Sequence, residues 1–185
     1  MNYSKRKIVL LSTTGLFAFF LILMVSISFI DTKLAGYISS MALTNILIGR
    51  VPSISLGTSL DLDILTVVFT IFTTEAILSL FFYTLFLYSL KNIKLLESLS
   101  NQVIKLHNTA SQYKEYIDKY GMFGLLFFVF MPFWMTGPVV GIIIGDLMNF
   151  SLVKNITIVA IGTFVAIFCW AIMIKYFIEY IQVFI

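Results

Sequence analysis

Residues 64–90 read ILTVVFTIFTTEAILSLFFYTLFLYSL, an apolar run in which Glu75 is the single charged side chain. A helix of that length measures about 40 Å, which exceeds the roughly 30 Å hydrocarbon core of a bilayer. Across the whole chain, apolar residues make up 60% and charged residues only 11%, and the mean hydropathy is +1.03. Soluble domains are about one quarter charged. The sequence therefore predicts an all-α integral membrane protein.

Two further apolar runs extend from Ile8 to Ile30 and from Ile156 to Ile185. The first is uncharged, is too long for the apolar part of a signal peptide, and lacks a small-residue cleavage site after it. We therefore expect a retained first transmembrane helix over residues 8–30. The basic residues Lys5, Arg6 and Lys7 precede it, which favours a cytoplasmic N-terminus of a multi-pass protein in the cell membrane.

Two other apolar stretches, residues 34–63 and 122–148, are interrupted by proline and glycine. All three prolines and, with Gly121 included, eight of the ten glycines lie in these two stretches. Broken backbone at membrane depth survives only where protein or a water-filled cavity surrounds it. Broken segments that are each followed by a clean helix are typical of transporters with inverted repeats. The spacing Pro-x4-Gly occurs in both stretches, at Pro52 and Gly57 and again at Pro132 and Gly137.

Two topologies fit this pattern. In one, both broken stretches are re-entrant hairpins that enter from opposite faces, and the C-terminus lies outside. In the other, residues 122–148 span the membrane. Each topology places nine of the twelve Lys and Arg residues inside, so the positive-inside rule leaves the side of the C-terminus open.

The polar segment from Lys91 to Lys119 carries apolar residues at alternating spacings of three and four, from Leu96 to Tyr120. That pattern predicts an amphipathic helix. Its lysines favour a position on the anionic inner leaflet of the membrane. Packing on the helix bundle and pairing with a second copy are the alternatives.

Glu75 is the strongest candidate for a functional side chain. A charge in the middle of an apolar run is costly, so it should face a cavity, find a partner or carry a proton. Burial disfavours the charged form of a carboxylate, which suits a proton carrier. We expect Glu75 to be unpaired and protonated, unless Arg50 reaches it, in which case the two side chains ionise as a pair. A neutral Glu75 hydrogen-bonded to nearby threonines is the structural alternative.

Arg50 stands just before Pro52 in the first broken stretch and is the only arginine outside the N-terminal cluster. A guanidinium binds phosphate or carboxylate through a planar fork, although snorkelling to headgroups is the alternative. Asp61 and Asp63 close the same stretch. Both are candidates for a substrate or proton path, and both are well placed to cap the helix that starts at Ile64.

Gly137, Gly141 and Gly145 are spaced to share one helix face, and Pro138 suits the first turn of that helix. Small residues at this spacing allow close helix packing, and lining a substrate path is the alternative. Asp146 follows this face and is a further candidate for the substrate or proton path, or for a cap.

Other classes of function lack support in the sequence. Cys169 and His107 are the only cysteine and histidine, so a disulfide or a cysteine- or histidine-based metal cluster is not expected. No nucleophile–base motif or phosphate-binding loop occurs, so an enzyme is not expected. We expect no metal and no cofactor. The net charge of +3 is too small and scattered to indicate nucleic acid.

Residues 119–141 read KYGMFGLLFFVFMPFWMTGPVVG and resemble the small multidrug export family, within the DedA-like superfamily of membrane proteins. The family pattern is Lys-Tyr-Gly, an apolar run, Pro-x-Pro-Gly-Thr-Gly and then a glycine four residues later. The matching positions here are Tyr120, Gly121, Gly124, Pro132, Thr136, Gly137 and Gly141. Upstream, Gly49 and Pro52 match the family's Glu-Leu-Arg-Gly-Gly-Ile-Pro segment, whereas its Glu and Arg fall on Ile46 and Ile48.

The resemblance, which covers about Ile46 to Tyr176, implies two inverted units of one re-entrant hairpin plus one helix. It implies a transporter, a lipid flippase or a scramblase, with proton coupling in related proteins. We expect one membrane domain over residues 1–185, with hairpin-plus-helix units at 34–90 and 120–185. Arg50, Glu75 and Asp146 should then lie near the midplane. The expected partners are membrane lipids, a small-molecule or lipid substrate and a second copy; a non-transporting scaffold subunit is the alternative.

Overall fold

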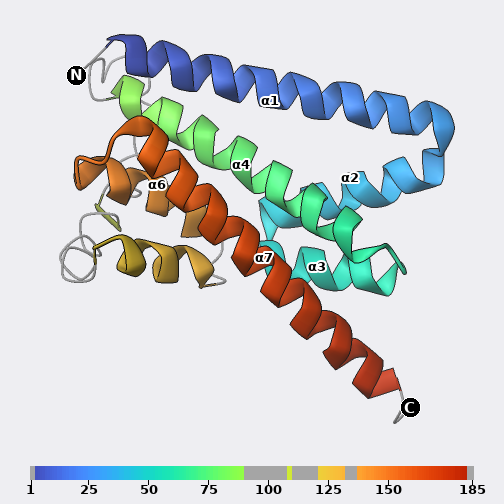
Figure 1. Cartoon of the computed structure of the whole chain (residues 1–185). Helices are drawn as coiled ribbons and strands as arrows, with labels where there is room; N and C mark the ends of the chain where they lie inside the picture. Colours follow the sequence, from blue (N-terminus) through green and yellow to red (C-terminus); the bar gives the residue numbers. More distant parts are fainter. Residues whose placement is uncertain (1–2, 90–107, 110–120, 132–136, 183–185) are drawn as a thin grey trace.

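The computed structural model describes residues 3–89, 108–109, 121–131 and 137–182, and all regular structure among them is helical (Figure 1). The helices, in chain order, are α1 (Tyr3–Ile30), α2 (Thr32–Leu47), α3 (Arg50–Ser59), α4 (Ile64–Ser89), a short helix Gly121–Phe130, α6 (Gly137–Leu147) and α7 (Leu152–Gln182). The prediction of an all-α protein is confirmed. The predicted amphipathic helix of residues 91–119 lies outside the described residues, apart from 108 and 109.

Three of these helices are long and apolar enough to cross a membrane: Lys5–Ile30, Ile64–Tyr88 and Leu152–Ile178. They coincide with the three apolar runs of the sequence. α1 buries few of its residues, so most of its apolar surface faces outward. A surface of this kind is compatible with lipid rather than with water, which supports the prediction of a membrane protein.

The first broken stretch forms two helices that run in opposite directions. α2 leads from the C-terminal end of α1 toward the middle of the molecule, and α3 leads back (Figure 1). Asp31 caps α2 by accepting hydrogen bonds from the backbone N–H groups of Lys33 and Leu34. Gly49, at the turn before α3, has φ 121°, a conformation that favours glycine. Pro52 lies in the first turn of α3, where the backbone needs no donor.

A short turn joins α3 to α4. The carboxylate of Asp63 accepts a hydrogen bond from the backbone N–H of Leu65, at 2.9 Å, which confirms the predicted cap of α4. Asp61 lies in the turn itself, with a left-handed φ of 54°. These two residues therefore shape the start of α4.

The second broken stretch also folds back on itself. The helix Gly121–Phe130 and α6 lie beside one another, and Pro132 and Thr136 lie in the connection outside the described residues. A Cβ at Gly141 would stand 2.6 Å from the Val129 side chain, and one at Gly145 would stand 1.9 Å from the Asn155 amide oxygen. The glycine face thus allows the close packing that its spacing predicts.

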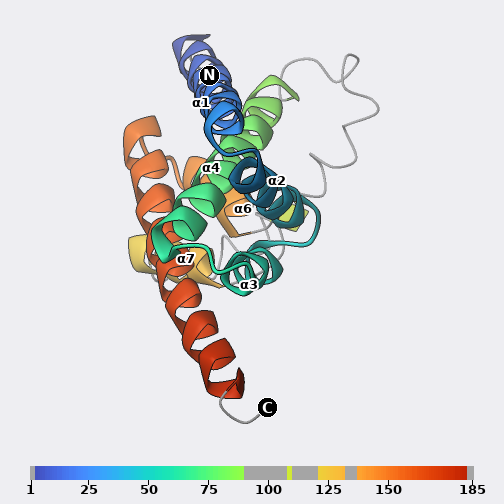
Figure 2. The ribbon, with the colours of Figure 1, turned by 90° about the vertical axis from the view of Figure 1, so that its right-hand side faces the viewer.

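α4 is the central element of the bundle, because it contacts α1, α2, α3, α6 and α7 (Figure 2). Two buried apolar clusters meet along it. One joins the first half of α1 and the end of α4 to the second broken stretch and the start of α7, and the other joins α2, α3 and the start of α4 to the later part of α7. The middle of α4, where Glu75 lies, falls between the two clusters.

The repeated Pro-x4-Gly spacing does not mark equivalent positions in the two stretches. Gly57 lies near the end of α3, whereas Gly137 is the first residue of α6. Pro52 is inside a helix, whereas Pro132 lies outside the described residues. The two glycines of the echo therefore occupy different places in their helices, and the inverted repeat stays a prediction.

Candidate functional site

Arg50 and Glu75 form a buried ion pair in the middle of the bundle. Arg50 Nε donates to Glu75 Oε1 and Arg50 Nη2 donates to Glu75 Oε2, both at 3.0 Å. The two residues are 4% and 7% exposed. A planar guanidinium bound to both oxygens of a carboxylate is the strongest geometry that such a pair can adopt. Of the two states expected for Glu75, the unpaired acid is therefore wrong and the pair with Arg50 is found.

The backbone places the guanidinium where the two broken stretches meet. Arg50 is the first residue of α3, directly after the turn at Gly49. Its Nη1 makes a long hydrogen bond, 3.4 Å, to the carbonyl oxygen of Val129 in the helix Gly121–Phe130. A Cβ at Gly137 would stand 3.4 Å from Arg50 Nη2, so the glycine that starts α6 leaves room for the charge. The alternative, in which Arg50 snorkels toward headgroups, is not found, because its guanidinium is paired with Glu75.

The positive charge of Arg50 and the negative charge of Glu75 neutralise each other in the buried site. Each charge alone would be costly at this degree of burial, and removing one partner of such a pair is strongly destabilising. In the segment that resembles the family, the positions of the family's Glu and Arg are Ile46 and Ile48 in this chain. Here the two charges instead come from α3 and α4, so that the pair joins a broken stretch to a long helix.

Asn45 lies beside the ion pair and was missed in the sequence. It is 2% exposed, and within the part of the chain that the structure describes neither its Nδ2 nor its Oδ1 has a hydrogen-bond partner. A small cavity of about 20 Å³ is lined by Asn45, Gly49, Arg50, Glu75, Leu78, Pro138 and Val139. The feature of the sequence that could have identified Asn45 is a polar amide side chain within an apolar helix, four residues before Gly49.

Asp146 does not join this site, which corrects the expectation that it lies with Arg50 and Glu75. It forms an ion pair with Lys5 and accepts a hydrogen bond of 2.9 Å from the hydroxyl of Tyr83. Tyr83 lies two turns beyond Glu75 on α4, a distance of about 12 Å along the axis. Asp146 therefore fastens the end of α6 to the N-terminal end of α1.

Asp61 and Asp63 lie apart from the ion pair as well. They line a polar cavity of about 270 Å³ at the start of α4, together with Thr58, Leu62, Ile64, Val67, Ala171, Lys175 and Ile178. Both side chains are exposed. Whether they belong to a path for substrate or protons stays a prediction.

Two further buried polar residues were missed. Asn155 is fully buried and donates a 2.7 Å hydrogen bond to the carbonyl of Ile142, so it fixes α7 to α6. Thr163 on α7 is 3% exposed, and its hydroxyl is unpaired among the described residues.

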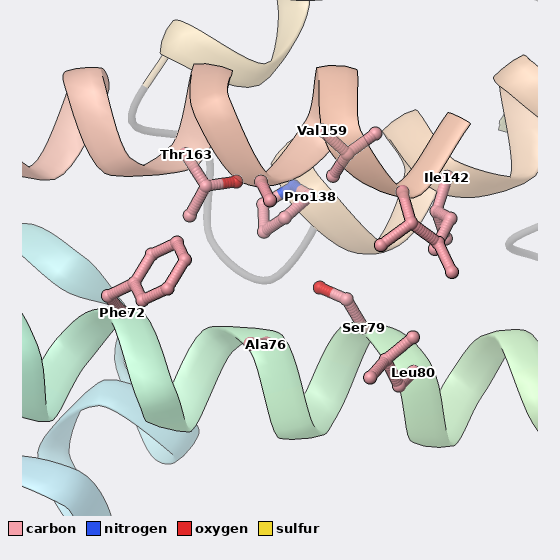
Figure 3. Close-up of a pocket in the computed structure, with 10 residues that line it drawn as sticks. Phe72, Ala76, Ser79, Leu80, Pro138, Ile142, Val159 and Thr163 are labelled. Carbon is pink, nitrogen blue, oxygen red and sulfur yellow. The ribbon is translucent and has the colours of Figure 1, made fainter. Parts of the chain in front are cut away.

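Cavities lie on two opposite faces of α4. A small one of about 60 Å³ lies between α4, α6 and α7, and Figure 3 shows Ser79, Pro138 and Thr163 around it. A larger one of about 430 Å³ lies between α1, α2 and α4. At 100° per residue, Glu75 occupies a face of α4 between the two. The ion pair thus stands between two spaces and can separate them.

Metal chemistry has no support in the described ranges, where no group of three His, Cys, Asp or Glu side chains could hold an ion. The polar groups that the structure brings together where the two broken stretches meet are the Arg50–Glu75 pair and Asn45. Such a set can bind, exchange a proton and change partners. It holds no nucleophile with an adjacent base.

Comparison with known proteins gives one informative result. No curated protein and no solved structure matches the chain. A family model described as "Putative small multi-drug export protein" matches residues 50–169, which is well over half of the 185 residues and includes both Arg50 and Glu75. The resemblance found in residues 119–141 is thereby confirmed at the level of that family, whose description indicates a membrane transporter-like role. The chain belongs to the small multi-drug export family.

Proposed function

We propose that this protein is a multi-pass transporter of the cell membrane, of the DedA-like type, in which the Arg50–Glu75 pair closes the passage between the two faces of the bilayer. The observation that carries the proposal is the buried, bidentate pair at the point where the two broken stretches meet. The transported substance is a small molecule or a lipid. For a lipid, the activity is that of a flippase or scramblase.

The proposed topology is a pair of re-entrant hairpins in an inverted arrangement. The helix Gly121–Phe130 and α6 would each be roughly 15 Å long, which is about half of a hydrocarbon core. The open end of this hairpin adjoins the start of α1 through the Lys5–Asp146 pair, and the open end of α2–α3 adjoins the end of α1 at Asp31. With Lys5, Arg6 and Lys7 cytoplasmic, the second hairpin enters from inside and the first from outside.

The proposed cycle uses a proton at Glu75. When Glu75 is ionised, two charge-assisted hydrogen bonds hold α3 against α4 and the passage is closed. When a proton binds a Glu75 carboxylate oxygen, the attraction to Arg50 falls and the guanidinium becomes available to a polar or anionic group of the substrate. Loss of the proton to the other face restores the pair. Ionisable residues inside a membrane usually mark substrate, ion or proton pathways, which favours the transporter over a scaffold subunit.

Reconstitution in liposomes tests the function. Purified protein with an imposed pH gradient should move at least one member of a panel of labelled lipids and cationic drugs, and Glu75→Gln should not move it. Asp31→Asn is the matched control, because it is the same chemical change at an exposed carboxylate, at the cap of α2, where asparagine caps as well as aspartate. If no member of the panel moves, the transporter proposal fails. If Glu75→Gln transports as fast as the wild type, the ion pair is not the gate.

Thiol labelling tests the topology. In a variant with Cys169→Ala and one cysteine added at the C-terminus, a membrane-impermeant maleimide added to intact cells should react. Labelling only after the cells are opened would instead support the topology in which residues 122–148 span the membrane.

A further inference from the structure

The cavity between α1, α2 and α4 has the form of a chain-binding site. Its volume is about 430 Å³, and it is lined by Thr13, Thr14, Phe17, Phe20, Ala42, Ile46, Thr74, Ile77, Leu78 and Phe81. These residues cover about two turns of α1 and two turns of α4, so the space runs roughly 10 Å along both helices.

The wall of the cavity presents carbon atoms although three threonines line it. The Thr13 hydroxyl donates to the carbonyl of Val9, that of Thr14 to Leu10, and that of Thr74 to Thr70. With their hydroxyls engaged by the backbone, these side chains expose methyl groups. A water molecule needs two to four polar partners, which this wall does not offer within the described chain, so the expected occupant is apolar.

The inner end of the cavity adjoins the ion pair. Leu78 lines both this cavity and the small space that holds Asn45, Arg50 and Glu75. Buried amides in native proteins almost always have hydrogen-bond partners. In the residues that the structure covers, the Asn45 amide has a partner at neither its donor nor its acceptor atom, which indicates a partner that comes from outside.

The outer end of the cavity is accessible from the side. Phe17 on α1 and Phe81 on α4 are 49% and 44% exposed, and the outward surface of α1 around them is apolar. A chain in the bilayer core could enter between these two rings without crossing water. The path from the rings to Leu78 then leads toward the polar cluster of Asn45, Arg50 and Glu75.

We propose that this cavity binds the alkyl chain of an amphiphile, and that Asn45 hydrogen-bonds the first polar group of that molecule, an ester, amide or hydroxyl, beside the Arg50–Glu75 pair. The proposal rests on the proposed function and names its substrate class. The chain supplies the binding energy in the cavity. Asn45 positions the polar end where proton uptake at Glu75 makes Arg50 available.

Photolabelling of the purified protein in lipid nanodiscs tests the site. Two probes distinguish the source of the chain: a phospholipid with a diazirine near the end of one acyl chain, and an alkyl trimethylammonium ion with the same group. Mass spectrometry locates the labelled residues. We expect labels on Phe17, Ala42 or Ile77 from at least one probe, with unlabelled probe reducing them in proportion to its concentration.

Two variants fill the cavity from different helices, Ala42→Leu on α2 and Ile77→Trp on α4, and each should reduce labelling at least tenfold. Leu43→Trp is the matched control, because Leu43 neighbours Ala42 but is 58% exposed outside the cavity, and its labelling should match that of the wild type. Asn45→Leu should weaken the affinity of an ester-containing probe about tenfold, as expected for one lost hydrogen bond. Circular dichroism identifies any variant that does not fold, and the other filling variant then decides.

Labelling that is spread evenly over the outer face of α1, or unchanged in both folded filling variants, would overturn the proposal. These results are distinguishable from failure of the proposed function. Cavity labelling without transport in liposomes supports the binding site and refutes the transporter. Transport that persists in a folded Ala42→Leu variant without cavity labelling supports the transporter and refutes this site.

Discussion

The first and second broken stretches share an outline of two short helices followed by a long one, but they contribute different chemistry to the centre of the molecule. α3 buries polar side chains, among them Arg50 and Ser53. α6 buries nine consecutive residues, Gly137 to Gly145, and none of them has a polar side chain. The first stretch therefore brings a charge, and the second brings glycines and a backbone carbonyl that allow this charge to approach.

The long helices differ in the same way. Glu75 in α4 and Thr163 in α7 each lie eleven residues after the first residue of their helix, and both are buried. Glu75 is paired with Arg50, whereas Thr163 faces the small cavity against α4 and α6 (Figure 3). Two halves with similar backbone arrangements can therefore have different roles. The first half holds the ion pair, and the second half provides the packing around it.

The largest effect is expected from breaking the ionic side of this comparison. Glu75→Gln keeps the size of the side chain but leaves the buried guanidinium of Arg50 without its counter-charge. We expect a loss of about 3–5 kcal/mol in stability, measured by unfolding of the purified protein in detergent.

The double variant Arg50→Met with Glu75→Leu separates stability from function. Replacing both charges by apolar residues should recover most of the lost stability while transport stays absent. If Glu75→Gln has the same unfolding midpoint as the wild type, the ion pair contributes little to stability. The two halves would then differ in their side chains but not in their contribution to the free energy of unfolding.

The next effect is expected from the packing side. A Cβ at Gly145 would stand 1.9 Å from the amide oxygen of Asn155, which is fully buried and bonded to the carbonyl of Ile142. Gly145→Ala should therefore displace Asn155 and cost about 2–3 kcal/mol through overpacking and a lost hydrogen bond. The same unfolding measurement applies.

Gly15→Ala is the matched control for that substitution. Gly15 lies within α1 with open space around its Cα, and alanine should stabilise the helix by about 0.5–1 kcal/mol. A Gly145→Ala protein as stable as Gly15→Ala would show that the contact between α6 and α7 is not tight.

A smaller effect is expected where the two halves are joined. Tyr83 on α4 donates a hydrogen bond to Asp146 at the end of α6, and Asp146 also pairs with Lys5. Tyr83→Phe should cost about 1.5 kcal/mol, since Asp146 loses one of its two partners and keeps the other. Combining it with Lys5→Met should cost more than the sum of the single changes, because the carboxylate then loses both; strictly additive losses would contradict this coupling.

Much of the fold could be predicted, because composition and hydropathy respond directly to the bilayer. The runs at residues 8–30, 64–90 and 156–185 appear as α1, α4 and α7, and the spacing of Gly137, Gly141 and Gly145 predicted their close packing. Helix contacts between distant segments could not be predicted. Arg50 and Glu75 are 25 residues apart, and the sequence offered their pairing only as an alternative; the turn between α3 and α4 lays the two helices together and brings the guanidinium to the carboxylate.

Residue type also misled at particular positions. Asp146 was grouped with Arg50 and Glu75 because all are charges within apolar sequence, but the folding back of α6 carries it to Lys5. Asn45, Asn155 and Thr163 carry no charge, so hydropathy and charge counts did not distinguish them from surface residues. These three residues affect packing and binding because they are buried, and the burial of a single polar residue cannot be read from the sequence.

The smallest effect sharpens the comparison between Glu75 and Thr163. The Thr163 hydroxyl lines a cavity of about 60 Å³ and finds no hydrogen-bond partner in the described residues, so burying it costs free energy without return. Thr163→Val has nearly the same shape, and it should leave the protein unchanged or stabilise it by up to about 1 kcal/mol, with normal transport. Thr163→Ala, which removes a methyl group as well, provides the control for lost packing and should be less stable than Thr163→Val. The other polar side chain that lines the cavity is Ser79, whose hydroxyl donates to the carbonyl of Glu75. If Thr163→Val proves less stable than the wild type by 1 kcal/mol or more, a water molecule must bridge these two hydroxyls, and the second half of the molecule would then hold a polar site of its own.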